Sequence, residues 1–119
     1  MDKDTYFIAV ASSDGIVVNS HFGRADKFYI FKVENEEEIK LVETREVLPV
    51  CEGGNHNEDK LKDNLLKLSD CKYLLVSRIG NGAMVMAESL GIEAYELPGI
   101  IEESTNQLIK YVKIQNLFH

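Results

Sequence analysis

The stretch KFYIFKVENEEEIKLVETREVL, residues 27–48, contains the pattern that decides the fold. Residues 27–33 are rich in aromatic and β-branched side chains, and residues 38–48 alternate well enough to form a second strand. The polar run ENEEE between them is typical of a solvated turn. We therefore expect the two strands to form an antiparallel hairpin.

The segments on either side of this hairpin supply further strands and helices. Short apolar runs predict three more strands, at residues 5–12, 71–77 and 92–97. Helical spacing and helix-stop signals predict three helices, at residues 57–70 with Asn57 as a possible N-cap, 81–91 and 100–118. The first half is thus a meander, and in the second half strands alternate with helices.

Such an alternation implies right-handed crossovers and parallel pairing. We expect a five-stranded mixed sheet in the order 3-2-1-4-5, in which only strand 2 is antiparallel, with helices on both faces. This three-layer α/β/α arrangement resembles a ribonuclease H-like topology. At 119 residues, the chain is long enough for a single domain over residues 1–119.

Composition limits the classes of function. The net charge is −7, whereas sequence-independent binding of nucleic acid needs a clustered basic surface. Such binding therefore has little support. No apolar run approaches the roughly 18 residues of a membrane span, and the first residues do not resemble a secretory signal, so we expect a cytoplasmic protein. Two cysteines make no disulfide framework, and an exposed thiol in a reducing compartment favours a ligand or reactive role.

The expected sheet places three loops at one edge. Strands 1, 3 and 4 point the same way, so the segments after them emerge together at residues 12–26, 49–56 and 77–83. Open α/β sheets bind ligands outside the carboxyl ends of their strands. We therefore predict that the functional site lies there.

The first of these loops contains a His-Phe-Gly-Arg turn. Gly23 permits a left-handed or tight backbone, Phe22 can anchor the loop on the core, and His21 and Arg24 are then free to face a ligand. The alternative is that His21 caps a turn and Arg24 pairs with a surface carboxylate.

The second loop, CEGGNH, combines a thiol, two glycines and an imidazole. The adjacent Gly53 and Gly54 allow close approach of a bulky group, while Cys51 and His56 are natural ligands for iron. So few ligands suit a preassembled cluster held at one or two positions. A glycine-rich turn with an incidental cysteine is the alternative.

The third loop, SRIGNGA, supplies Arg78 and a glycine-rich helix start at Gly80 and Gly82. Free N–H groups at such a helix start favour anions. Tight packing between strand and helix is the alternative, and the two are compatible.

These segments together resemble the dinitrogenase iron-molybdenum cofactor biosynthesis family. The resemblance rests on IAVASSDGIVVNSHFGRADKFYIFKV, on CEGG and on VSRIGNGA. It implies a ribonuclease H-like fold and the binding of an anionic iron-sulfur-metal cofactor, with His21 and Cys51 as cluster contacts. The sequence has no CxxxCxxC segment, so we expect a protein other than the radical enzyme that synthesises the cofactor precursor.

Three functions follow from these observations. The first is a non-enzymatic carrier of an iron-sulfur or iron-molybdenum type cluster, held by His21, Cys51 and His56 and balanced in charge by Arg24 and Arg78, with cluster donor and acceptor proteins as partners. The second is a regulatory or interaction module of the same fold that binds a simple metal ion, a small anion or a protein. A nuclease is the least supported, because the chain is acidic and lacks a spaced carboxylate set.

Overall fold

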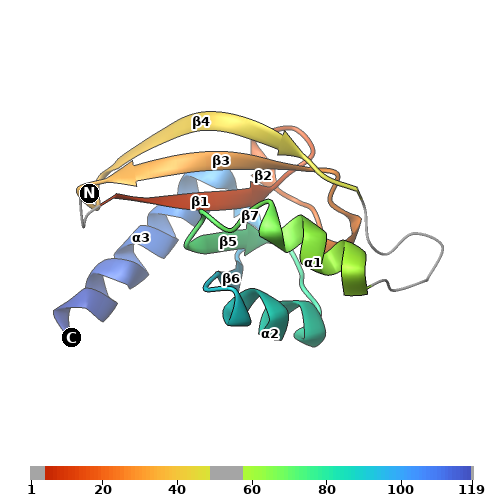
Figure 1. Ribbon diagram of the computed structural model, residues 1–119. Helices are drawn as coiled ribbons and strands as arrows, with labels where there is room; N and C mark the ends of the chain where they lie inside the picture. The colour runs from red at the N-terminus through yellow and green to blue at the C-terminus, as the bar shows by residue number, and fades with distance from the viewer. Residues whose placement is uncertain (1–4, 49–57, 119) are drawn as a thin grey trace.

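The computed structural model describes residues 5–48 and 58–118, which form a five-stranded mixed sheet between helices (Figure 1). The strands, in chain order, are β1 (Thr5–Ala11), β3 (Lys27–Glu34), β4 (Glu38–Glu46), β5 (Tyr73–Val76) and β6 (Glu93–Glu96). Their order across the sheet is β4-β3-β1-β5-β6. β3 pairs antiparallel with β1 and β4, whereas β1, β5 and β6 pair in parallel. The expected mixed sheet with one antiparallel strand is thus confirmed.

The hairpin of β3 and β4 closes through the three residues 35–37, which link the paired residues Glu34 and Glu38. Asn35 and Glu36 both have positive φ, at 55° and 58°, and the Glu37 N–H donates to the Glu34 carbonyl at 3.2 Å. This backbone matches the primed turns that follow the right-handed twist of paired strands. Asn35 tolerates the left-handed conformation because its side chain is short and polar.

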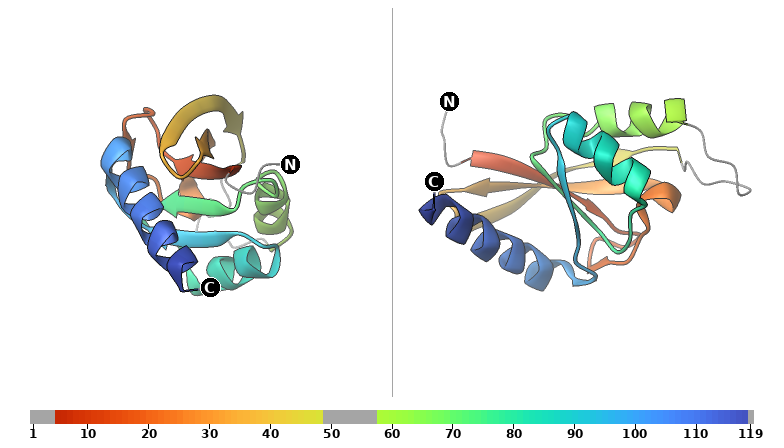
Figure 2. Two further views of the ribbon diagram at one scale, coloured as in Figure 1. Left: turned by 90° about the vertical axis from the view of Figure 1, so that its left-hand side faces the viewer. Right: turned by 90° about the horizontal axis from the view of Figure 1, so that it is seen from below.

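Side-chain alternation along β1 divides the interior into two apolar cores. Ile8 and Val10 pack with the long helix α3 (Ile101–Leu117), whereas Ala9 and Ala11 pack on the opposite face. That face carries α1 (Glu58–Leu66) and α2 (Asn81–Ser89), and Figure 2 shows α3 on the other side of the sheet. The expected three layers are therefore confirmed. Among the described residues, no helix is both long and apolar enough to cross a membrane.

Short elements near the first loop were not expected. β2 (Val17–Val18) pairs with β7 (Gly99–Ile100), and the Ile101 N–H donates to the Ile16 carbonyl at 2.8 Å. The last helix therefore begins one residue later than expected, after β7. The described part of the first helix ends at Leu66 instead of residue 70, and its expected cap, Asn57, lies outside the described residues.

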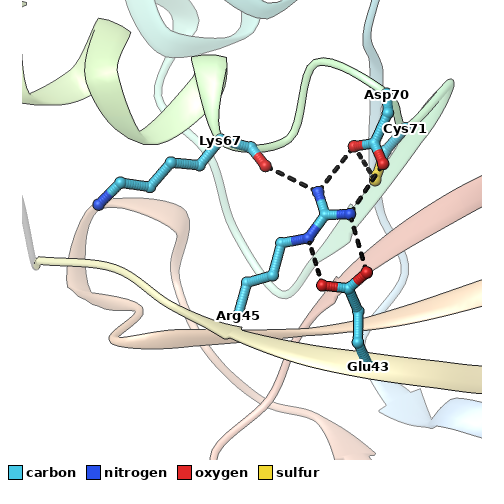
Figure 3. A network of polar contacts seen from close by, with 5 residues as sticks. All are labelled: Glu43, Arg45, Lys67, Asp70 and Cys71. Carbon is cyan, nitrogen blue, oxygen red and sulfur yellow. Dashed lines mark hydrogen bonds and ion pairs between the residues drawn. The ribbon is translucent and has the colours of Figure 1, made fainter.

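An arginine on the edge strand β4 ties this strand to the connection between α1 and β5 (Figure 3). The Arg45 guanidinium donates to both carboxylate oxygens of Asp70, at 2.7 and 2.8 Å, and to the Lys67 carbonyl at 2.7 Å. It also donates to Glu43 at 3.0 Å. These bonds lower the pKa of the Asp70 carboxyl below its usual range. Edge strand and helical layer are thus held together by a charge-assisted network.

Candidate functional site

The carboxyl ends of β1, β4 and β5 lie at the same edge of the sheet, as the strand pairings require. The loop after β1 meets the turn after β5 there, because His21 and Arg78 form an isolated parallel bridge. Two backbone hydrogen bonds hold the contact: Ser77 N–H to the Ser20 carbonyl at 3.0 Å, and Phe22 N–H to the Arg78 carbonyl at 2.8 Å. Two of the three predicted loops are therefore neighbours.

The start of the first loop is shaped by Asp14. Its carboxylate accepts the N–H groups of Ile16 and Val17 at 2.9 and 3.1 Å, and these bonds lower the pKa of Asp14. Gly15 follows with φ 77°, and a Cβ there would lie 2.8 Å from the Tyr29 ring, so only glycine fits without strain. Asp14 thus stabilises the turn, and among the described residues it belongs to no group of three His, Cys, Asp or Glu side chains that could hold a metal ion.

The His-Phe-Gly-Arg turn forms a short 3-10 helix, Phe22–Arg24. Phe22 is buried, with its ring centroid 5.9 Å from that of Phe28, so the expected anchor is confirmed. His21 and Arg24 are exposed, and the His21 side chain does not cap the turn. Gly23 lies inside this tight turn, and its φ is not positive. The left-handed backbone considered for Gly23 is therefore absent, whereas the tight one is present.

The turn after β5 presents Arg78 and two open glycines. A Cβ on Gly80 or Gly82 would meet no atom within 4 Å, so the packing explanation for these glycines is wrong. Between them and Arg78, Ile79 is buried, and its N–H donates to the Glu96 carboxylate at 2.9 Å. The open space leaves the backbone at the start of α2 accessible to a large group.

The second predicted loop carries Cys51, Gly53, Gly54 and His56, which all lie outside the described residues. On its described side, Leu48 follows β4 at the same sheet edge, and its carbonyl accepts the side-chain amide of the buried Asn64 at 2.6 Å. The contribution of the thiol and of the second imidazole to the site therefore stays a prediction.

The described edge exposes basic side chains beside the carboxylates of Asp14 and Glu96. His21, Arg24 and Arg78 are exposed there, and neither arginine pairs with a carboxylate within residues 5–48 and 58–118. In the same ranges, no group of three His, Cys, Asp or Glu side chains could hold a metal ion. In a chain with a net charge of −7, this edge is suited to an anionic ligand.

Sequence reasoning did not identify Glu96 as a residue of this edge. Glu96 ends the strand motif EAYE, where an exposed glutamate looks like an ordinary solvent-facing residue. Its bond to the Ile79 N–H depends on the pairing of β5 with β6, which the local pattern does not encode. No signal in the sequence alone would have found it.

The fold and the candidate site together define a small α/β domain that exposes His21, Arg24 and Arg78 at one edge of its sheet. The family described as "Dinitrogenase iron-molybdenum cofactor" matches residues 4–111, and the chain belongs to this family. The resemblance expected from the sequence is therefore confirmed.

The curated relatives are longer proteins. The FeMo cofactor biosynthesis protein NifB of Chlorobaculum tepidum is 32% identical over 126 residues, which cover 99% of this chain and 28% of the relative. NifB of Frankia alni is 35% identical over 108 residues, covering 88% of this chain and 21% of the relative. The chain thus spans about a quarter of the length of these proteins.

A solved structure shares the architecture. The crystal structure of PH0822 has a TM-score of 0.67 and 28% sequence identity, covering 87% of this chain and 88% of the other. The five-stranded mixed sheet and its helical layers are therefore shared by a protein of similar length.

Proposed function

We propose that this domain binds and carries a preassembled iron-sulfur or iron-molybdenum type cluster as its cargo during cofactor biosynthesis, without catalysing a reaction itself. The observation that carries the proposal is the bridge that holds exposed His21 beside exposed Arg78 at the sheet edge. An imidazole suits iron, and the arginine offsets the negative charge of a cluster rich in sulfide.

The other residues have distinct roles in the proposal. Cys51 and His56 complete the ligand set, because thiolate and imidazole are the donors that iron prefers among the residues of this chain. Arg24 adds a second guanidinium, and Phe22 fixes the turn that carries it. The glycines at positions 23, 53, 54, 80 and 82 let the cluster come close to the backbone.

Partners follow from the nature of the cargo. A carrier must receive its cluster from a donor protein and pass it to an acceptor, so both belong to the proposal, whereas nucleic acid and membrane do not. Thiolate ligands stay reduced in the cytoplasm, and we place the protein there. The relatives named as FeMo cofactor biosynthesis proteins support this setting.

The test measures cluster retention without oxygen. Isolated iron-molybdenum cofactor is added to the wild type and to Cys51→Ala, His21→Ala and His119→Ala, and retained iron and visible absorbance are compared after desalting. We expect the first two variants to bind at least about tenfold more weakly, since losing a metal ligand or its orienting partner typically costs 10–100-fold. His119→Ala, which removes an imidazole without a proposed role, should bind as the wild type does.

Circular dichroism must show that both variants keep their fold. If Cys51→Ala and His21→Ala retain as much cluster as the wild type, the carrier assignment is wrong.

The unpaired cations also favour a second candidate, a module that binds a small anion or a single metal ion at the same edge. Stoichiometric binding of phosphate or of one ferrous ion, with no cluster absorbance, would identify it. Loss of phosphate binding in Arg78→Ala would then locate the anion at this edge.

A further inference from the structure

We propose that Glu96 is a positioning residue for the candidate site: its carboxylate fixes the turn that presents Arg78. The inference rests on the proposed function, which assigns Arg78 to an anionic cargo. It starts from one contact, the hydrogen bond from the Ile79 N–H to Glu96 Oε2 at 2.9 Å. Ile79 is the residue between Arg78 and Gly80, so this bond acts at the centre of the turn.

Backbone groups hold the turn on both sides of this contact. The Arg78 carbonyl accepts the Phe22 N–H at 2.8 Å, and the Gly80 carbonyl accepts the Met84 N–H at 2.9 Å in the first turn of α2. Between these two bonds, the partner of Ile79 is a side chain. A single substitution at Glu96 can therefore release the middle of the turn without removing either backbone bond.

The end of β6 explains why a side chain is used here. Glu96 is the last residue of β6 and lies opposite Val76, the last residue of β5. The Leu97 N–H still donates to the Val76 carbonyl at 3.0 Å, and the chain then leaves the sheet at Pro98. No further backbone of β6 runs beside Ile79, so the Glu96 carboxylate supplies the acceptor that a longer strand would have supplied.

The burial of Ile79 makes its hydrogen bond to Glu96 important for the turn. Ile79 is 7% exposed and belongs to the core beneath α1 and α2. A backbone N–H of a largely buried residue costs free energy when it lacks a partner, so loss of the Glu96 carboxylate frees the turn to rearrange. A shift at Ile79 moves Arg78, which is covalently next to it.

The positioning role of Glu96 can be distinguished from a purely electrostatic role, because the two roles predict different changes in cargo affinity. A carboxylate at this edge repels an anionic cargo, so removing its charge alone should strengthen cargo binding. Removing the hydrogen bond should weaken binding by disordering Arg78. The two roles therefore predict opposite changes in cargo affinity for a substitution that removes both the charge and the hydrogen bond.

The experiment compares Glu96→Gln, which keeps an acceptor oxygen, with Glu96→Ala, which removes it. Glu93→Ala is the matched control, because Glu93 is an exposed glutamate at the other end of β6. Amide hydrogen exchange of Ile79 is measured by NMR in the cluster-free protein, and retention of isolated iron-molybdenum cofactor is measured in parallel.

We expect Ile79 exchange to be at least about tenfold faster in Glu96→Ala, and cofactor binding about fivefold weaker, which is the effect of losing one ordinary intramolecular hydrogen bond. Glu96→Gln should exchange within about threefold of the wild type and bind the cofactor at least as tightly, because it retains an acceptor and loses the repelling charge. Glu93→Ala should match the wild type in both measurements.

Unchanged Ile79 exchange in Glu96→Ala would overturn the inference, and so would tighter cofactor binding by that variant. Glu96→Gln behaving like Glu96→Ala would also overturn it, because the acceptor oxygen would then have no role. Fast exchange in Glu96→Ala, together with no cofactor retention by the wild type, would reject the proposed function and still support Glu96 as the residue that fixes the turn.

Discussion

At the scale of single residues, burial determines the chemistry of Cys71. Cys71 is 1% exposed, and its thiol lies 3.7 Å from the Asp70 carboxylate (Figure 3). Burial raises the pKa of Cys71 to about 12, and the neighbouring negative charge adds to this effect. Cys71 therefore stays a protonated thiol at neutral pH and is a poor metal ligand.

The burial of Cys71 predicts slow alkylation of its thiol. In Cys51→Ser, the remaining thiol of Cys71 should react with iodoacetamide at pH 8 at least about 100-fold more slowly than free cysteine, because both thiolate fraction and access are low. The same protein unfolded in urea should be labelled fully, as mass spectrometry would show. Rapid labelling of the folded variant would contradict the burial of this thiol.

The local turn of the site was predictable residue by residue, whereas its long-range contacts were not. Phe22 as an anchor and His21 and Arg24 as exposed side chains follow from turn chemistry within a few positions. The acceptor role of Glu96 depends on a residue 17 positions away. Sequence spacing contains no information on such a pair until the strands are placed.

At the scale of elements, β4 depends on its tie to the helical layer. Arg45→Met removes five side-chain hydrogen bonds to Asp70, Glu43 and the Lys67 carbonyl, and it leaves both carboxylates without their cation. We expect the free energy of unfolding in urea to fall by about 1–2 kcal/mol, since both carboxylates are half exposed and water replaces part of the loss.

Lys32→Met is the matched control for this prediction. It breaks an exposed pair with Glu34 at 3.7 Å on the neighbouring strand. Such surface pairs contribute little, so the change should stay below about 0.5 kcal/mol. Equal losses in the two variants would mean that the Arg45 network adds nothing beyond an ordinary surface ion pair.

Long elements were predictable from periodicity, and short ones were not. The hairpin of β3 and β4 and the parallel strand β5 have enough residues to show a pattern. The two-residue strands β2 and β7 have no measurable period, and they pair across more than 80 residues of sequence. Their pairing also explains why α3 begins at Ile101 and not one residue earlier.

At the scale of the whole molecule, acid should weaken the fold. Hydrogen bonds to Asp14, Glu43 and Asp70 lower the pKa of each carboxyl in the folded state. A depressed folded pKa contributes stability above the unfolded value of about 4, and this contribution is lost as the pH falls through the folded pKa. The free energy of unfolding in urea should therefore be lower at pH 3 than at pH 7.

Arg45→Met tests the origin of this pH dependence. Without the guanidinium, Glu43 and Asp70 should titrate closer to their ordinary values, so the loss of stability between pH 7 and pH 3 should be smaller than in the wild type. An identical loss in both proteins would show that other carboxyl groups cause the acid sensitivity.

The bridge between His21 and Arg78 also makes the sheet edge a site that can be redesigned. Main-chain hydrogen bonds align the two positions, and both side chains are exposed. The backbone geometry here therefore does not depend on which side chains the two residues carry. If the proposed function holds, exchanging either side chain should change which anionic cargo is preferred while the main-chain framework stays in place. Cargo preference and scaffold stability would then be altered by different substitutions.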